Sequence, residues 1–109
     1  MKKFVFIYYG KVTPDQISKE EMKNVMDNWM TWFGTFKDQM IDGGNPFAPD
    51  AKSVTQKGVE TIPLDMWPSK GYTIINAKDM AEATEIAKGC PALKDDPDGA
   101  VRVYEAMPM

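Results

Sequence analysis

The pattern of apolar and polar positions first shows a strand in which both faces are apolar. The segment from Lys3 to Tyr9 is rich in β-branched and aromatic residues. Phe4, Phe6 and Tyr8 alternate with Val5, Ile7 and Tyr9. Because side chains alternate across a strand, this pattern predicts a central strand that is covered on both sides.

A helical period follows after a loop over residues 10–16. Ser18, with Glu21 three residues later, is typical of a capping box. Apolar side chains then recur every three or four residues and predict one long amphipathic helix that runs to about Met40. They are Met22, Val25, Met26, Trp29, Phe33, Phe36 and Met40. The segment from Asp42 to Pro46 is predicted to stop this helix, because paired glycines permit left-handed backbone and proline cannot continue a helix.

The second half of the chain predicts two further strand regions, a second helix and a last strand. Residues 53–57 and 59–62 flank Gly58 and indicate a weak strand or hairpin at the edge of the sheet. The segment from Gly71 to Ala77 has a β-branched centre. Residues 79–88 place Met80, Ala83, Ile86, Ala87 and Cys90 on one helical face, and residues 100–107 alternate as a closing strand.

The order β-α-β-β-α-β is typical of an α+β, ferredoxin-like domain with a four-stranded antiparallel sheet. One domain, spanning residues 1–109, is expected at this length. Two helices cover only one face of such a sheet, whereas the first strand is apolar on both faces. A second copy that packs sheet against sheet is the simplest cover, so we expect a homodimer.

Composition narrows the range of partners. The net charge is −3, and Arg102 is the only arginine, so no basic stripe indicates nucleic acid. The charged start Met1-Lys2-Lys3 resembles a signal peptide, but its apolar run is too short and is interpreted as a strand. No segment is apolar over the length that a membrane span needs. Cys90 is the only cysteine, which favours a cytoplasmic location.

Several segments together resemble the YCII-related family, including its DGPF-type members. They are residues 71–93 (GYTIINAKDMAEATEIAKGCPAL), residues 101–105 (VRVYE), the paired tyrosines Tyr8 and Tyr9, the tryptophan-bearing helix, and Asp42 to Phe47 (DGGNPF). The resemblance covers most of the chain. It implies a dimeric α+β barrel in which two ferredoxin-like sheets face each other and leave a pocket near the long helix.

Two departures from that family bear on catalysis. Members proposed to be enzymes carry a histidine on the first helix paired with an aspartate, and this chain has no histidine. The DGPF segment before the third strand is replaced by residues 63–68 (PLDMWP), which keep an acid and an aromatic side chain but lose the glycine. The family's dyad is therefore not carried over, and histidine is unavailable as a general base.

Three other residues are candidates for acid-base chemistry. Asp42 can present a carboxylate at a pocket rim, and its alternative role is a helix stop. The phenol of Tyr9 can donate a proton or anchor a ligand, or it can be an ordinary core tyrosine. Arg102, which shares a strand face with Tyr104, can bind a carboxylate or enolate in bidentate fashion, or form a salt bridge across the dimer.

Aromatic and amide side chains are the candidate pocket lining. An aromatic stripe can stack a planar ligand, although such a stripe also serves as core. Trp32 lies toward the edge of that stripe, and its indole N–H needs a partner if buried. The predicted lining is Trp32, Asn45, Phe47, Trp67 and Tyr104.

No cofactor or metal is expected. Residues 95–99 (DDPDG) suggest a calcium loop, but Lys94 would occupy the first ligand position and no helix follows, which favours a solvated acidic turn. Cys90 is interpreted as a small buried apolar residue. The chain lacks both the phosphate-binding loop and the GxGxxG pattern, so a nucleotide is not indicated.

These residues leave two main hypotheses for function. The first is an acid-base isomerase or lyase that acts on a small anionic or carbonyl-containing molecule through Asp42, Tyr9 and Arg102. The alternative is a non-catalytic ligand-binding or regulatory dimer that uses the same pocket. A purely structural homodimer is a third.

Overall fold

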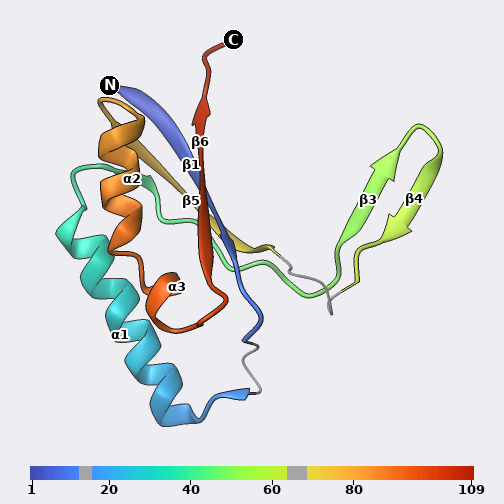
Figure 1. The fold of residues 1–109 in the computed structure, drawn as a ribbon, viewed down its shortest axis with the longest axis horizontal. Helices are drawn as coiled ribbons and strands as arrows, with labels where there is room; N and C mark the ends of the chain where they lie inside the picture. Colours follow the sequence, from blue (N-terminus) through green and yellow to red (C-terminus); the bar gives the residue numbers. More distant parts are fainter. Residues whose placement is uncertain (13–15, 64–68) are drawn as a thin grey trace.

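The chain forms a mixed α+β domain with a projecting hairpin (Figure 1). The computed structural model describes residues 1–12, 16–63 and 69–109. Within them the main sheet contains β1 (Lys2–Tyr9), β2 (Met40–Asp42), β5 (Ser69–Ala77) and β6 (Ala100–Ala106). The helices are α1 (Lys19–Thr35), α2 (Met80–Lys88) and α3 (Pro91–Lys94), and the hairpin is β3 (Lys52–Thr55) with β4 (Gly58–Thr61).

The main sheet has the strand order β2-β5-β1-β6, and all its pairings are antiparallel. This order confirms the predicted α+β, ferredoxin-like fold. β1 is central, as predicted, because it pairs with β5 on one side and with β6 on the other. The chain therefore brings its N-terminal strand and its C-terminal strand side by side.

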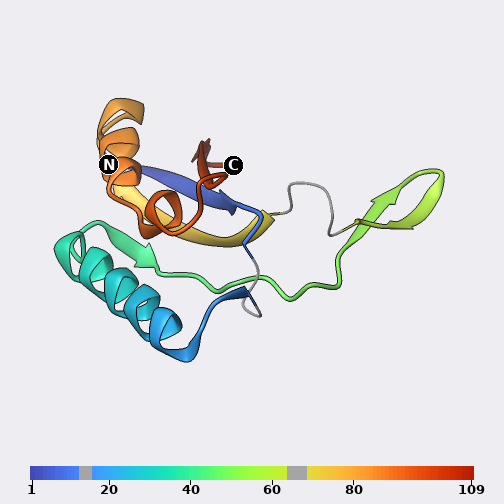
Figure 2. The same ribbon diagram turned by 60° about the horizontal axis from the view of Figure 1, so that its bottom comes forward.

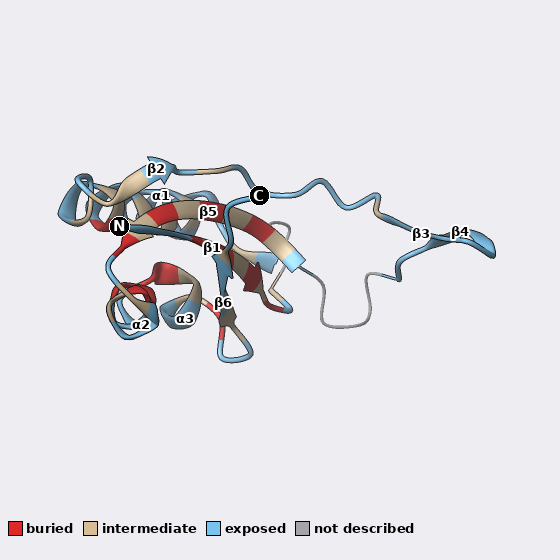
Figure 3. Ribbon diagram, turned by 90° about the horizontal axis from the view of Figure 1, so that it is seen from above, coloured by how far each residue is buried: buried red, intermediate tan, exposed pale blue. Residues whose placement is uncertain are grey.

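The core lies between one face of this sheet and the helices. Phe4 and Phe6 of β1 are fully buried, and they pack with Ile75 of β5 and with apolar residues of α1 and α2. Burial alternates strictly along β5, which Figure 3 shows as alternating red and tan bands. This is the pattern of a sheet with only one face covered by helices.

Helix α1 begins as predicted but ends earlier. The Ser18 side chain accepts the backbone N–H of Glu21, and the Glu21 carboxylate accepts that of Ser18, which completes the capping box. The helix stops at Thr35 rather than near Met40, because Met40 leaves the helical path and pairs with Ile75 as the start of β2. The apolar period continues past the helix end because Phe36 and Met40 still face the core.

The edge of the sheet also differs from the prediction. The hairpin over residues 52–61 exists, but it forms a separate two-stranded sheet. The edge position beside β5 belongs instead to β2, a strand of three residues. β2 could not be predicted from the sequence, because three residues are too few to show an alternation of apolar and polar side chains. Figure 2 shows the hairpin far from the helices.

The second half of the chain otherwise folds as predicted. Asp79 caps α2 by accepting the backbone N–H of Glu82, and Gly89 ends the helix. Ala83, Ile86, Ala87 and Cys90 are buried, but Met80 in the first turn of α2 is 44% exposed and does not join the core. No helix in the described part of the chain is long and apolar enough to cross a membrane.

In the described part of the chain, no helix covers the other face of the sheet (Figure 3), and we call it the open face. Register pairs Val5 with Ile74 and Tyr104, and Ile7 with Tyr72 and Arg102, so these side chains share that face. Val5, Ile7 and Ile74 are only half-buried, and Tyr104 is 49% exposed. The predicted two-sided character of β1 is therefore present, and its second side lies against solvent in a single chain.

Candidate functional site

The open face holds a row of three residues on neighbouring strands, and we call the surface above this row the slot. Ile7 lies in the middle, Tyr72 is opposite it on β5, and Arg102 is opposite it on β6. Neighbouring strands are about 4.8 Å apart, so the backbones that carry Tyr72 and Arg102 are about 10 Å apart.

Arg102 lies over the ring of Tyr9 on one side of the slot. The guanidinium carbon is 4.6 Å from the ring centroid, a cation–π contact that holds the charged group close to the sheet. Tyr9 follows Ile7 by two residues on β1, so it is the diagonal neighbour of Arg102 on the same face. The structure thus brings two of the three predicted acid-base residues together.

The other side of the slot is aromatic. The ring of Phe47 stacks on that of Tyr72, with centroids 5.9 Å apart. The backbone N–H of Phe47 donates to the carbonyl of Lys70, and the carbonyl of Asn45 accepts from Tyr72. Asn45 and Phe47 therefore run along β5 at this edge of the slot. Tyr72 was not among the predicted residues, although its alternation with Ile74 could have identified it.

Asp42 lies at the far edge of the same face. It ends β2 opposite Ile74, in the row that continues through Val5 to Tyr104. Its carboxylate is exposed and accepts the backbone N–H of Gly44 at 2.8 Å. Three strand spacings, about 14 Å, separate β2 from β6. Within one chain, Asp42 and Arg102 do not meet.

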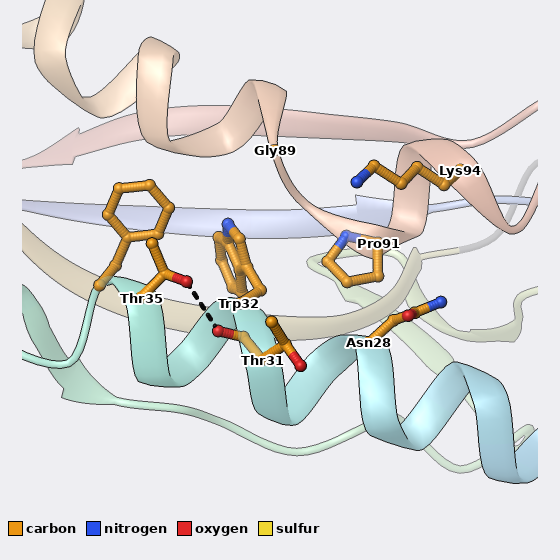
Figure 4. A pocket seen from close by; sticks show the side chains of 8 residues that line it. Asn28, Thr31, Trp32, Thr35, Gly89, Pro91 and Lys94 are labelled. Carbon is orange, nitrogen blue, oxygen red and sulfur yellow. Dashed lines mark hydrogen bonds between the residues drawn. The ribbon is translucent and has the colours of Figure 1, made fainter.

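Trp32 lies on the opposite side of the sheet from this slot. It is 4% exposed, packs against Phe6, and its indole N–H donates to the carbonyl of Ile86 at 3.2 Å. The partner that burial requires is thus a helix carbonyl. Trp32 instead borders an outer cavity of about 270 Å³ between α1 and the α2–α3 junction (Figure 4).

The outer cavity has few polar groups available for a ligand. The hydroxyls of Thr31 and Thr35 donate to carbonyls of α1, each at 2.9 Å. Asn28 and Lys94 are the remaining polar side chains of its lining. A second cavity, of about 500 Å³, lies between the two ends of the chain. Neither cavity is lined by Asp42, Tyr9 or Arg102.

A buried polar chain connects β1 to the turn after β2. The phenol of Tyr8 donates to the hydroxyl of Thr73 at 2.5 Å, and that hydroxyl donates to the carbonyl of Gly43 at 2.9 Å. Burial raises the pKa of Tyr8, so its phenol stays protonated. Tyr8 thus belongs to the core, and of the two adjacent tyrosines only Tyr9 reaches the open face.

Cys90 lies in the core beside Tyr8. It is fully buried, and this burial raises the pKa of its thiol to about 12. The thiolate is therefore scarce at neutral pH, which makes Cys90 unsuited to nucleophilic catalysis. The structure agrees with the prediction of a small buried apolar residue.

We expect Cys90 to resist thiol reagents until the protein unfolds. The raised pKa alone lowers the thiolate fraction about 10³-fold below that of an exposed cysteine, and burial also blocks access. The measurement is the rate of reaction with a chromogenic disulfide reagent at pH 8, with and without guanidinium. Native and unfolded rates within tenfold of each other would contradict the buried placement.

The acidic turn at residues 95–99 is a structural clamp. The Asp96 carboxylate accepts the backbone N–H groups of Lys11, Val12 and Asp98. Among the described residues no group of three or more acidic or cysteine side chains is placed to hold a metal ion. Trp67, the last residue of the predicted lining, lies outside the described residues.

Comparison with known proteins supports the fold. No protein-family model matches the chain, and neither does any curated protein. Seven solved chains match it in structure. One is 5-chloro-2-hydroxyhydroquinone dehydrochlorinase (TftG) from Burkholderia phenoliruptrix AC1100, solved in complex with 2,5-dihydroxybenzoquinone. It is 16% identical, with a TM-score of 0.51, and the match covers 94% of this chain and 93% of TftG. The two proteins share a fold, which is consistent with the resemblance to YCII-related proteins.

Proposed function

We propose that the open face binds a small planar anion or carbonyl compound in a pocket that a second copy of this chain completes. The observation that carries this proposal is the position of Arg102, held over Tyr9 at the side of an apolar slot. A guanidinium has five N–H donors in a fixed plane, and it pairs with carboxylates and enolates in bidentate fashion. The apolar floor and the aromatic wall of Phe47 and Tyr72 suit a flat ligand.

A homodimer supplies the cover that this site lacks. Val5, Ile7 and Ile74 form an apolar centre on a sheet face without helices, and packed sheets lie about 10 Å apart. At this distance between the two sheets, the apolar centre is buried. Space for a ligand remains between the sheets where the facing side chains are small. Exclusion of water would strengthen the attraction between Arg102 and an anion, because charges interact more strongly at low dielectric.

The same dimer can bring Asp42 to Arg102. A two-fold axis parallel to the strands exchanges the two edges of the sheet, so that β2 of the second copy lies over β6 of the first. Asp42 shares a row with Tyr104, the residue two positions after Arg102. In this arrangement Asp42 of the second copy faces the Arg102 end of the slot.

Catalysis would then divide between the two copies. The carboxylate of Asp42 takes a proton from the carbon next to a carbonyl, and the bonding electrons move to the carbonyl oxygen as an enolate. Arg102 pairs with that oxygen, the phenol of Tyr9 donates a hydrogen bond, and return of the proton to another carbon gives an isomer. The shared fold with TftG supports the ligand class, because 2,5-dihydroxybenzoquinone is a planar ring that carries carbonyl and hydroxyl groups.

We expect Arg102→Met to weaken binding of 2,5-dihydroxybenzoquinone at least tenfold. Loss of one charge-assisted contact costs about 1.5–3 kcal/mol, which corresponds to roughly 10- to 150-fold in Kd. Calorimetric titration measures this, with Lys88→Met as the control, since Lys88 pairs with Glu85 on the exposed side of α2. Equal affinities for Arg102→Met and the wild type would overturn the proposed anchor.

Asp42→Asn separates an enzyme from a binding module. The probe for this test is 1,4-cyclohexanedione, a cyclic ketone with C–H bonds next to its carbonyls, because every carbon of 2,5-dihydroxybenzoquinone is sp². For an enzyme, this change removes hydrogen–deuterium exchange at those carbons and leaves the Kd within a few-fold. For a non-catalytic module, the wild type itself shows no exchange.

A cytoplasmic location stays a prediction from the single free cysteine.

A further inference from the structure

The hairpin of β3 and β4, residues 52–61, projects from the body of the protein, and we call it the arm. Figures 1 and 2 show it at the far end of the long connection that follows β2. All eight of its strand residues are exposed, and among the described elements β3 and β4 make substantial contact only with each other. A hairpin of two short strands is only marginally stable by itself in water. An ordered arm therefore implies a surface on which it packs.

The two faces of the arm differ: one carries an apolar valine pair beside the hydrogen-bonded Lys52 and Thr61, and the other is polar. Val54 is directly opposite Val59, and these two side chains are 74% and 64% exposed. Ser53 is opposite Glu60 on the other face. Strand residues alternate between faces, so this pattern is that of a hairpin that buries its valine pair and leaves its polar pair in water.

The open face is small compared with a standard dimer interface. Three strands of about seven residues make a flat surface of roughly 350 Å², from a spacing of about 4.8 Å and a rise of about 3.3 Å per residue. A standard interface buries about 800 Å² on each partner. The accessible surface of a patch exceeds its flat area, yet the open face still spans less than a standard interface, and the exposed valine pair of the arm can add to it.

We propose that the apolar face of the arm packs on a second copy of this chain, beside that copy's open face, and forms one wall of its pocket. This proposal rests on the proposed function for the identity of the pocket. A two-fold dimer is self-complementary, so each copy gives an arm and receives one. Val54 and Val59 of one copy would then exclude water from the Arg102 site of the other.

The test removes the apolar face of the arm but preserves the hairpin. In the variant Val54→Lys/Val59→Glu, the opposed lysine and glutamate form a cross-strand pair that supports the hairpin. The matched control is Ser53→Lys, which creates the same kind of pair with Glu60 on the polar face. Sedimentation equilibrium without ligand gives the dimer Kd, which we expect to rise at least tenfold in the double variant and less than threefold in the control.

The outcomes separate this inference from the proposed function. An unchanged dimer Kd in the double variant would overturn the inference about the arm alone. A wild type that stays monomeric at millimolar concentration would overturn both this inference and the proposed dimer pocket. If the double variant weakens the dimer while Arg102→Met leaves ligand binding unchanged, the arm inference holds and the proposed ligand site fails. If the double variant leaves the dimer Kd unchanged while Arg102→Met weakens ligand binding, the proposed ligand site holds and the arm inference fails.

A second measurement needs no variant. Hydrogen exchange of the arm amides in the wild type should accelerate when the protein is diluted below its dimer Kd, because docking is what protects them. Amides of β1 in the sheet centre should keep their protection under the same dilution and serve as the internal control. Arm exchange that is fast and independent of concentration would contradict docking on a second copy.

Discussion

Replacement of Gly44 by alanine is expected to destabilise the protein by about 3 kcal/mol or more. Gly44 has a φ of +78°, a left-handed conformation that costs other residues about 1–2 kcal/mol. A Cβ at this position would also overlap the backbone carbonyl oxygen of Tyr72, which cannot move without displacing β5. The measurement is the free energy of unfolding from urea titration.

This substitution would also affect the candidate site, because Gly44 is the second residue after β2. Its backbone N–H donates to Asp42, and the neighbouring carbonyl of Gly43 accepts from Thr73. Displacement of this turn would move Asp42 and loosen the register of β2 on β5. We therefore expect Gly44→Ala to show faster amide exchange at the β2 edge than at the β1–β6 pairing.

Gly34→Ala is the matched control. Gly34 lies inside α1, and a Cβ there meets no atom within 4 Å. Alanine is favoured over glycine in a helix interior by about 1 kcal/mol, so this change should stabilise the protein. Destabilisation of similar size in both variants would show that the Gly44 effect is not specific to its conformation.

The fold could be predicted wherever the chain repeats a period over enough residues. Three sequence features that rest on local geometry all appear in the structure. They are the apolar side chains on both faces of β1, the capping box before α1 and the apolar face of α2. The edge strand could not be predicted in this way. β2 is defined by its pairing with β5, a contact between residues about 35 positions apart, and its three residues have no pattern of their own.

The candidate site likewise has features that could be predicted from the sequence and features that could not. Arg102 and Tyr9 meet because they occupy the neighbouring strands β6 and β1 of the predicted ferredoxin-like sheet. Trp32 could not be assigned to a face from the sequence, because the helical period places it toward an edge while packing buries it under Phe6 and α2. The separation of Asp42 from Arg102 depends on the identity of the edge strand, so it became visible only in the structure.

Asp96→Asn is expected to cost about 2 kcal/mol of stability near neutral pH. One oxygen of the Asp96 carboxylate accepts the N–H groups of Lys11 and Val12, at 2.7 and 2.8 Å, and the other accepts that of Asp98 at 2.8 Å. An asparagine amide keeps one acceptor and turns an NH₂ group toward the remaining donor. Hydrogen bonds to a charged group contribute about 1.5–3 kcal/mol, which sets the expected size. The control is Asp38→Asn, which removes one negative charge from an exposed position and should change stability by less than about 0.5 kcal/mol.

The effect of Asp96→Asn on the unfolding free energy should depend on pH, and this dependence is the sharper test of the role of the Asp96 carboxylate. Burial alone would raise the pKa of Asp96, but the three backbone N–H groups and Lys70 more than offset it and hold the pKa below its usual range. A carboxyl group with a lowered pKa stabilises the fold fully above its unfolded pKa of about 3.9, and this contribution disappears as pH falls through the folded pKa. The difference in unfolding free energy between the wild type and Asp96→Asn should thus be constant from about pH 8 to 5 and shrink below about pH 4. A difference that stays constant down to pH 2 would mean that the charge of Asp96 does not hold the loops after β1 and before β6 together.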